Sequence, residues 1–366
     1  MIYKEYGTTG IKVSALGFGG MRFRSEEYKK DPAMSAEVVR YANSKGINYF
    51  DTAPGYCDDM SEIIYGNAFK DMPGQFYVAT KSSYWSDKTA DDVRRRCEAS
   101  LKRMNVEYID FYQMWSIMNM AHFRNVMAPG GPYEGAVKLK EEGLIKHICL
   151  STHASGEEIK EIVTGCAFEG ILLGYNATNF AFRQEGIKAA YAQGMGVVTM
   201  NPLGGGVIPQ NPQFYSFLVE KEGETVAQAA LRFNMSHKEI TVALSGMGSK
   251  EEVDENILAA ENLEVVSEAR ISEIKDHLFS SLNDLCTGCG YCEGCPADIP
   301  IPRMMDAYNM SILSGDINEI SSRLKYHWGL KQEVAAACIE CGQCEEHCTQ
   351  HLPIIKRLKE IAELKK

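Results

Sequence analysis

Between Val13 and about Ala260, short apolar runs alternate with stretches in which apolar residues recur at helical spacing. The runs are rich in β-branched and aromatic residues, as expected for parallel strands that are buried on both faces. The eight predicted strands comprise residues 13–18, 48–51, 76–81, 109–115, 147–151, 170–175, 196–200 and 240–245. The clearest helical patterns between them cover residues 36–44, 91–103, 156–163 and 226–235.

Eight strands that alternate with helices predict an α/β protein whose first domain is a closed (β/α)8 TIM barrel. An open, doubly wound sheet is the competing architecture. Residues 3–13 predict a hairpin that would plug the bottom of the barrel, with Gly7 and Gly10 bounding its turn. The Met-rich segment 116–133 is too long for a tight loop, and it predicts either a lid on the substrate side or an insertion.

The pattern changes after about Val265, where helical segments and cysteine runs replace the strand signal. The 366 residues fit a barrel of roughly 250 residues followed by a module of about 100. We therefore expect two domains, residues 1–265 for the barrel and residues 266–366 for a small, mainly helical domain. Apolar residues at helical spacing, with lysines between them, predict a docking helix over residues 354–366.

The charge and the apolar runs exclude two classes of partner. A net charge of −11 and a pI near 5.3 argue against nucleic acid as a ligand. The longest apolar runs are strand-sized, which argues against a membrane span, and the amino terminus lacks a secretory apolar region. We expect a cytoplasmic protein.

Twelve cysteines are the unusual feature of the composition, and eight of them lie between residues 286 and 348. Cytosolic thiols stay reduced, so the clustering indicates metal binding rather than disulfides. In each run, three cysteines at two-residue spacing would hold one 4Fe–4S cluster, and the fourth would reach the other cluster. One predicted set is Cys286, Cys289, Cys292 and Cys348; the other is Cys338, Cys341, Cys344 and Cys295.

Two structural zinc sites are the alternative, although zinc sites usually separate pairs of cysteines by longer loops. The spacing departs from that of ferredoxins in two places: a two-residue gap precedes Cys295, and Thr349 replaces a proline. The wide separation of the two runs resembles a helical two-cluster ferredoxin. The remaining cysteines are predicted to be small buried hydrophobes: Cys57, Cys97, Cys149 and Cys166.

Catalytic groups of β/α barrels lie at the carboxyl ends of the strands, and four such positions carry reactive side chains. Asp51 ends the second predicted strand, Tyr56 follows it, and Lys81 and Trp115 end the next two. An ammonium beside a tyrosine would lower its pKa from about 10, and a carboxylate would hold the ammonium in place. Asp51, Tyr56 and Lys81 therefore predict a proton-donating unit, although each residue alone also has an ordinary structural interpretation.

The segment that runs from Phe50 to Tyr56, with Ser61, Glu62 and Gly66 after it, resembles the signature of the aldo-keto reductases. The similarity extends over residues 6–22, 79–82, 109–112, 175–176, 201–204 and 255–256. The cysteine tail resembles the branch of that family that carries a ferredoxin-like module with two 4Fe–4S clusters. The resemblance therefore covers the barrel and the tail.

The resemblance implies a carbonyl reductase or alcohol dehydrogenase that uses a nicotinamide cofactor. Tyr56 would be the general acid and base, tuned by Lys81 and Asp51. The cofactor would contact residues in several strand-end loops: Gly20, Met21, Ser151, Asn176, Met200, Pro202, Leu203, Gly204, Ser245, Gly246, Met247, Glu252 and Asn256.

Two departures from the family pattern bear on function. Trp115 stands where the family places a catalytic histidine; an indole N–H donates a hydrogen bond but exchanges no proton. His153, just past the fifth strand, would compensate or would be an ordinary polar loop residue. Where many members carry an arginine for the 2′-phosphate of NADP this chain has Gly248, and Glu252 replaces a glutamine. With Lys250 as the expected nearby cation, these residues favour NAD over NADP.

We expect an oxidoreductase that acts on a small carbonyl or alcohol, with clusters that transfer electrons or hold the tail in place. If the clusters transfer electrons, we also expect a redox partner protein that exchanges electrons with them. Two alternatives remain because of Trp115: an electron-transfer or accessory protein, and a dehydratase or isomerase that uses the same acid–base unit. A nicotinamide gives two electrons and a cluster accepts one, and no sequence signal indicates a flavin to bridge them.

Overall fold

The computed structural model describes residues 1–83, 85–154, 156–165, 168–177, 180–277, 285–286, 290–325 and 330–364. The chain divides into two compact units. One comprises Met1–Pro202 and Leu218–Ser267, and the other comprises Leu203–Phe217 and Glu268–Lys366. The predicted domain boundary at residues 265 and 266 stays a prediction.

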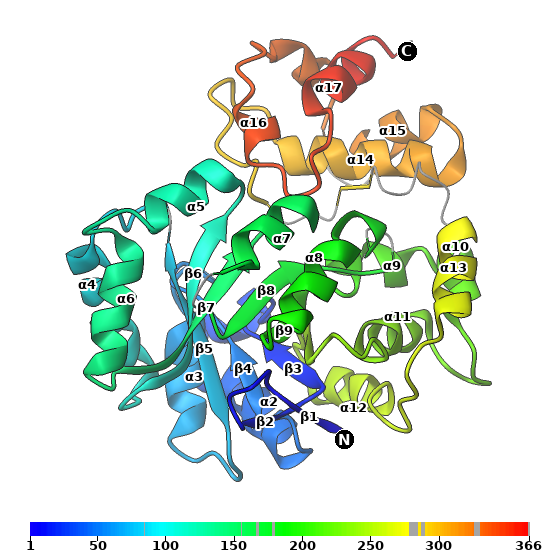
Figure 1. Cartoon of the computed structure of the whole chain (residues 1–366). Helices are drawn as coiled ribbons and strands as arrows, with labels where there is room; N and C mark the ends of the chain where they lie inside the picture. Colours follow the sequence, from blue (N-terminus) through cyan, green and yellow to red (C-terminus); the bar gives the residue numbers. More distant parts are fainter. Residues whose placement is uncertain are drawn as a thin grey trace. The chain divides into compact units, whose positions relative to one another are not determined.

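The first unit contains a closed barrel of parallel strands in the order β10-β3-β4-β5-β6-β7-β8-β9 (Figure 1). Consecutive strands pair, and the last strand closes on the first. The strands are β3 (Leu16–Gly19), β4 (Tyr49–Asp51), β5 (Tyr77–Ser83), β6 (Ile109–Ile117), β7 (Ile145–Thr152), β8 (Gly170–Gly174), β9 (Gly196–Met200) and β10 (Val242–Ser245). The predicted TIM barrel is confirmed, and the open sheet is excluded.

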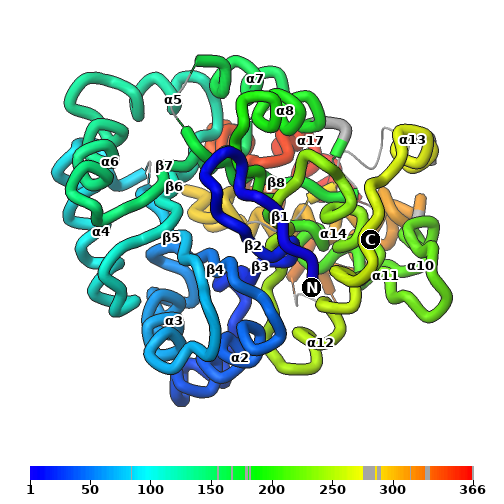
Figure 2. Tube along the Cα trace, turned by 60° about the horizontal axis from the view of Figure 1, so that its bottom comes forward, coloured from blue at the N-terminus to red at the C-terminus, as the bar shows by residue number. Residues whose placement is uncertain are grey.

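The predicted hairpin is also present, and its side chains reach into the bottom of the barrel. Strand β1 (Tyr3–Glu5) pairs antiparallel with β2 (Lys12–Ser14), and Figure 2 shows this hairpin across one end of the barrel. Tyr6 packs so closely that a Cβ atom on Gly170 would lie 2.1 Å from its hydroxyl oxygen, and one on Gly196 would lie 2.3 Å from its ring. The predicted strand 13–18 is thus two elements, because Val13 still belongs to the hairpin.

Helices surround the barrel, and loops connect them to its strands. In this unit they are α1 (Ser25–Tyr28), α2 (Pro32–Ser44), α3 (Ser61–Phe69), α4 (Ala90–Met104), α5 (Met120–Val126), α6 (Pro132–Glu141), α7 (Gly156–Val163), α8 (Phe180–Ala192), α11 (Val226–Met235) and α12 (Lys250–Leu258). The predicted lid or insertion 116–133 contains the end of β6, helix α5 and the start of α6.

The described residues of the second unit form helices, 3₁₀ turns and loops and contain no strand, which confirms the mainly helical domain. Its helices are α9 (Val207–Gln210), α10 (Pro212–Tyr215), α13 (Glu268–His277), α14 (Ile301–Ser314), α15 (Asn318–Arg323), α16 (Gln343–Glu346) and α17 (Ile354–Ala362), with 3₁₀ turns at Gly204–Gly206, Ser216–Leu218 and Gln332–Ala337. The apolar face of α17 is buried in the core of this unit through Ile354, Leu358 and Ile361. The predicted docking helix is therefore an integral part of the fold. Within the described ranges, no helix combines the length and apolarity that crossing a membrane requires.

Candidate active site

A buried ion pair lies at the carboxyl ends of neighbouring strands β4 and β5. The ammonium of Lys81 donates to Oδ1 of Asp51 at 2.6 Å and to the carbonyl oxygen of Thr52 at 2.7 Å. Gln113, on the next strand, donates to Oδ2 of Asp51 at 2.9 Å. Asp51 and Lys81 are at most 5% exposed, so three neighbouring strands fix both charges in a nearly dry environment.

Tyr56 lies beside this pair, and Trp115 lies beside Tyr56. The ammonium of Lys81 is 5.0 Å from the centre of the Tyr56 ring. The rings of Tyr56 and Trp115 meet edge to face, with their centres 5.9 Å apart and their planes at 84°. Both aromatic residues are half-buried. The structure thus brings together all four side chains that the sequence singled out.

The electrostatics of Tyr56 differ from the sequence-based expectation of a lowered pKa. Burial of the phenol and the charge of Asp51 raise the pKa of Tyr56, and Arg22 opposes that shift. Burial also raises the pKa of Asp51 and lowers the pKa of Lys81, because each charged form loses hydration. The tyrosine is therefore protonated at neutral pH in this state of the protein.

A second layer of polar contacts holds the strand ends in place. The carboxylate of Glu62 is buried, accepts from the Thr80 hydroxyl at 2.7 Å and pairs with Arg103 at 2.6 Å. Thr80 immediately precedes Lys81, so Glu62 helps to fix the strand that carries the ammonium. No local sequence pattern indicates these contacts or a role for Gln113. Gln113 could have been found, because it lies two residues before Trp115 and so points to the same face of β6.

Of two predicted nicotinamide contacts, Ser151 lies near the end of β7 and Asn176 follows β8. Ser151 is fully buried, and its hydroxyl has no hydrogen-bond partner among the residues that the structure describes. Asn176 is also buried and donates to the carbonyl oxygen of Asn201 at 3.0 Å. The buried guanidinium of Arg183 donates to the carbonyl oxygens of His153 at 3.2 Å and Gly174 at 2.9 Å. Arg183 therefore fixes the loops beside Ser151 and Asn176.

His153 is not an exposed loop residue. It is 1% exposed, and its amide donates to the carbonyl oxygen of Ile117 at 3.0 Å. The contact joins the loop after β7 to the end of β6, just beyond Trp115.

The predicted adenosine loop follows β10. Asn256 donates to the hydroxyl of Ser245 at 3.1 Å, so these two residues contact each other, and the side chain of Met247 is fully buried. The carboxylate of Glu252 pairs with Arg24 at 3.0 Å. The expectation that Lys250 is the only nearby cation is therefore wrong, because Arg24 reaches this loop from the segment between β3 and α1, far away in the sequence.

The remaining predicted cofactor contacts are distributed over both units. Gly20 is buried and its amide donates to the carbonyl oxygen of Asp51 at 2.8 Å, whereas Met21 is 44% exposed. Met200 ends β9, and Pro202 is the last residue of the first segment of the barrel unit. Leu203 and Gly204 begin the Leu203–Phe217 segment, which groups with the carboxyl-terminal unit.

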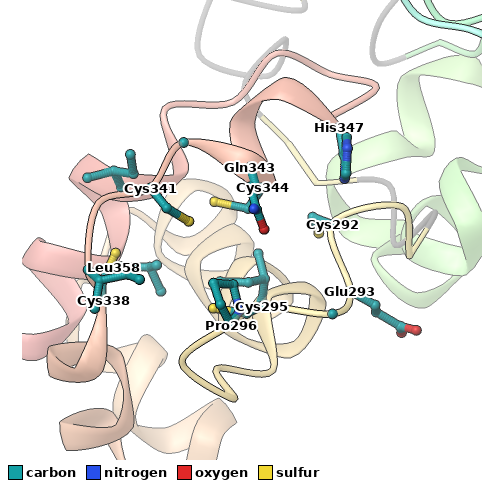
Figure 3. A pocket seen from close by; sticks show the side chains of 15 residues that line it. Cys292, Glu293, Cys295, Pro296, Cys338, Cys341, Gln343, Cys344, His347 and Leu358 are labelled. Atoms are coloured by element: carbon teal, nitrogen blue, oxygen red, sulfur yellow. The ribbon is translucent and has the colours of Figure 1, made fainter.

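In the carboxyl-terminal unit, one cavity is lined by five of the predicted ligands. Cys295, Cys338, Cys341 and Cys344 contribute to its wall, as Figure 3 shows, and Cys292 borders it as well. Cys341 is exposed and the other three are half-buried. These four cysteines form one of the two sets that the spacing predicts.

A second cavity of this unit is lined by cysteines of the other set. Cys286, Cys292 and Cys348 contribute to its wall. All three are buried in the apolar core of the unit. The fourth predicted member, Cys289, lies outside the described residues. No three Cys, His, Asp or Glu side chains of the described ranges are grouped to hold a single metal ion.

The cysteines of the barrel differ in exposure. Cys97 and Cys149 are buried, as predicted, and burial raises the pKa of each thiol to about 12. Cys57 is half-buried, because it follows Tyr56 in a loop at the barrel mouth, so the prediction of burial is only partly met there. Cys166 lies outside the described residues.

Comparison with known proteins identifies both parts of the chain. Residues 15–278 match the Aldo/keto reductase family, and residues 285–352 match the 4Fe-4S dicluster domain. A relative described as L-galactose dehydrogenase from Arabidopsis thaliana is 28% identical over 289 residues, which are 71% of this chain and 88% of that protein. An Escherichia coli relative described as NADH-specific methylglyoxal reductase is 27% identical over 230 residues, which are 55% of this chain and 67% of that protein.

A solved structure supports the fold. The aldo-keto reductase AKR11C1 from Bacillus halodurans (holo form) superposes with a TM-score of 0.64 at 22% identity, and covers 76% of this chain and 96% of that chain. The family match covers more than half of this chain, from the barrel's first strand past its last helix. The chain therefore belongs to the aldo/keto reductase family of oxidoreductases and carries a 4Fe–4S dicluster domain after its barrel.

Proposed function

We propose that the barrel catalyses the reversible reduction of a small carbonyl compound to an alcohol with a nicotinamide nucleotide. The observation that carries the proposal is the buried pair of Asp51 and Lys81 next to Tyr56, with the indole of Trp115 in edge-to-face contact with the phenol. A barrel that served only as a scaffold would gain nothing from two buried charges at this position, because their desolvation is costly.

In this mechanism the hydroxyl of Tyr56 donates its proton to the carbonyl oxygen. Lys81 stabilises the tyrosinate that forms, and Asp51 and the carbonyl oxygen of Thr52 hold the ammonium in place. The indole N–H of Trp115 orients the carbonyl oxygen without exchanging a proton. The raised pKa of Tyr56 keeps its proton available for reduction at neutral pH.

The residues near the barrel mouth fit a nicotinamide. The unpartnered hydroxyl of Ser151 is buried and would bind the carboxamide together with Asn176. The bound nucleotide supplies the hydride, and the chain's own residues bind the ring, orient the substrate and supply the proton. The activities named for the two relatives above, a sugar dehydrogenase and a methylglyoxal reductase, support this assignment of reaction class.

We propose two 4Fe–4S clusters, one in each cysteine-lined cavity, because all four members of one predicted set line the first cavity and three members of the other set line the second. A cluster exchanges single electrons when bound. The buried position of Cys286, Cys292 and Cys348 in the apolar core indicates that these residues also couple metal binding to folding of the unit. We propose that hydride chemistry in the barrel proceeds without reducing the clusters.

The test is reduction of a panel of small aldehydes and ketones with NADH or NADPH. The loss of the reduced-nicotinamide absorbance measures the rate. We expect turnover of at least one substrate class. Binding of neither nucleotide would contradict the proposal and would favour the accessory role. Nucleotide-independent elimination or isomerisation would favour the dehydratase or isomerase alternative.

The pH dependence of carbonyl reduction should reflect the Asp51–Lys81 pair. The pKa of Asp51 is raised above 3.8 and that of Lys81 is lowered below 10.5. Both residues are therefore charged over a narrower range of pH than free side chains would be. We expect a bell-shaped profile of kcat/KM that falls on the acid side as Asp51 is protonated and on the alkaline side as Lys81 loses its proton. A flat profile from pH 4 to pH 10.5 would contradict this assignment.

Replacing Trp115 tests the hydrogen bond to the substrate. Trp115→His should change kcat or the range of carbonyls accepted, because an imidazole offers a smaller donor that also exchanges protons. Thermal unfolding should change little, since Trp115 is only half-buried. A large loss of thermal stability with unchanged kinetics would show that the indole is a packing residue.

A further inference from the structure

The side-chain amide of Gln113 lies inside the barrel, between its aromatic core and its mouth. Phe111, Gln113 and Trp115 share one face of β6, and Phe111 belongs to the buried core of the barrel. The strand register sets Gln113 opposite Lys81 on β5. From there Nε2 of Gln113 reaches Oδ2 of Asp51, on the strand beyond β5, at 2.9 Å.

The carboxylate of Asp51 is therefore bound at both oxygens. Its Oδ1 accepts from the ammonium of Lys81 at 2.6 Å, and its Oδ2 accepts from Gln113. The three side chains are at most 5% exposed, so water is poorly placed to replace either donor. With one donor on each oxygen, the orientation of the carboxylate toward the ammonium is fixed.

The other end of the same amide gains nothing comparable. Oε1 of Gln113 is buried and has no hydrogen-bond partner among the residues that the structure describes. A buried acceptor without a partner costs free energy, and a methionine would fill nearly the same space without that cost. Within the described part of the chain, the hydrogen bond to Asp51 is thus the polar contact that favours an amide at this position.

Burial raises the pKa of Asp51, and both Lys81 and Gln113 oppose that rise. The titratable groups that face Asp51 are Lys81 on β5, Tyr49 on β4, Tyr56 in the loop after β4, and Tyr65 on α3. Burial raises the pKa of each of these three phenols, so they are neutral in acid. The carboxylate of Glu62 acts on Lys81 rather than on Asp51.

We infer that Gln113 is a positioning residue, which keeps the Asp51 carboxylate ionised and aligned with the ammonium of Lys81. It acts on Tyr56 only through this pair. The consequence is that carbonyl reduction continues to a lower pH than the lysine alone would allow. This inference rests on the proposed function.

The experiment compares the pH profile of kcat/KM for an aldehyde or ketone that the cluster-loaded protein reduces. The variants are Gln113→Met, which keeps the length of the side chain without a donor, and the isosteric Gln113→Glu. Gln75→Met is the matched control, because it removes an exposed amide that donates to the Tyr77 hydroxyl at 2.8 Å, near the other end of β5.

A second measurement needs no substrate. Infrared spectra recorded across the acid range follow the protonated carboxyl of Asp51 in the wild type and in Gln113→Met. The band is assigned to Asp51 by its absence from Asp51→Asn. The pH at which it appears reports the titration of this carboxyl directly.

In Gln113→Met, we expect the acid limb of kcat/KM and the infrared titration to move to higher pH by about one unit, because the carboxylate loses a donor. The value at the optimum should fall by less than about tenfold, since the pair with Lys81 remains. Gln113→Glu should move the acid limb further, because two adjacent carboxyl groups share a proton. Gln75→Met should retain the wild-type profile.

The inference and the proposed function fail differently. If folded Gln113→Met loses rate equally at every pH, with the acid limb and the infrared titration unmoved, Gln113 is a packing residue and the inference is refuted. If Gln113→Met does not fold, a wild-type acid limb in Gln113→Glu refutes it instead. An equal shift in Gln75→Met would also contradict it. If the wild type reduces no carbonyl, the proposed function fails, and the infrared titration still decides whether Gln113 keeps Asp51 ionised.

Discussion

Replacing Tyr56 by phenylalanine should reduce carbonyl turnover at least about a hundredfold, which is the usual contribution of a positioned general acid. The substitution removes only the hydroxyl and leaves the ring in its contacts with Lys81 and Trp115. Nucleotide binding should therefore be preserved, and the loss should appear in kcat. The measurement is steady-state kinetics beside a fluorescence titration of the nucleotide.

Tyr191→Phe is the matched control. It removes a phenol hydroxyl from α8 at a position that is 48% exposed, so its turnover should equal that of the wild type. A Tyr56→Phe enzyme with full activity would exclude Tyr56 as the acid.

Single cysteine replacements in the carboxyl-terminal unit should each remove about half of the iron if the unit holds two 4Fe–4S clusters. Cys341→Ala removes a proposed ligand from the more exposed cavity alone, and Cys348→Ala removes one from the buried cavity alone. Loss of the buried cluster should also lower helix content, since Cys348 belongs to the apolar core of the unit. Iron analysis and far-ultraviolet circular dichroism measure the two effects.

Cys97→Ala serves as the control, because Cys97 is buried in α4 of the barrel unit. Its iron content should match that of the wild type. Unchanged iron in both Cys341→Ala and Cys348→Ala would rule out the proposed ligand sets.

The sequence was sufficient to predict the barrel and the grouping of Tyr56 with three other side chains, because both depend on local patterns. Strand ends in a parallel barrel meet at one face, so Asp51, Lys81 and Trp115 could be placed together from their positions alone. Cysteine spacing likewise singled out the cysteines that line the two cavities, although Cys292 lines both of them.

Features that depend on long-range packing could not be predicted in this way. Arg24 reaches Glu252 only because β3 and β10 close the barrel, which no local pattern records. The pKa of Tyr56 follows from its burial, and burial is set by the whole barrel mouth rather than by the neighbouring lysine. The grouping of Leu203–Phe217 with the carboxyl-terminal unit is also a result of contacts between distant segments.

An anaerobic titration of the oxidised, cluster-loaded protein with NADH and then NADPH tests the central claim most directly. Tryptophan fluorescence reports binding near Trp115, and the visible absorption of the clusters reports their reduction in the same cuvette. We predict saturable quenching without bleaching, followed by nucleotide oxidation when a carbonyl substrate is added. If neither nucleotide quenches the fluorescence, the barrel is not a nicotinamide-dependent reductase. If the clusters bleach, electrons pass from the nucleotide to the clusters, which contradicts the proposal that hydride chemistry leaves them oxidised.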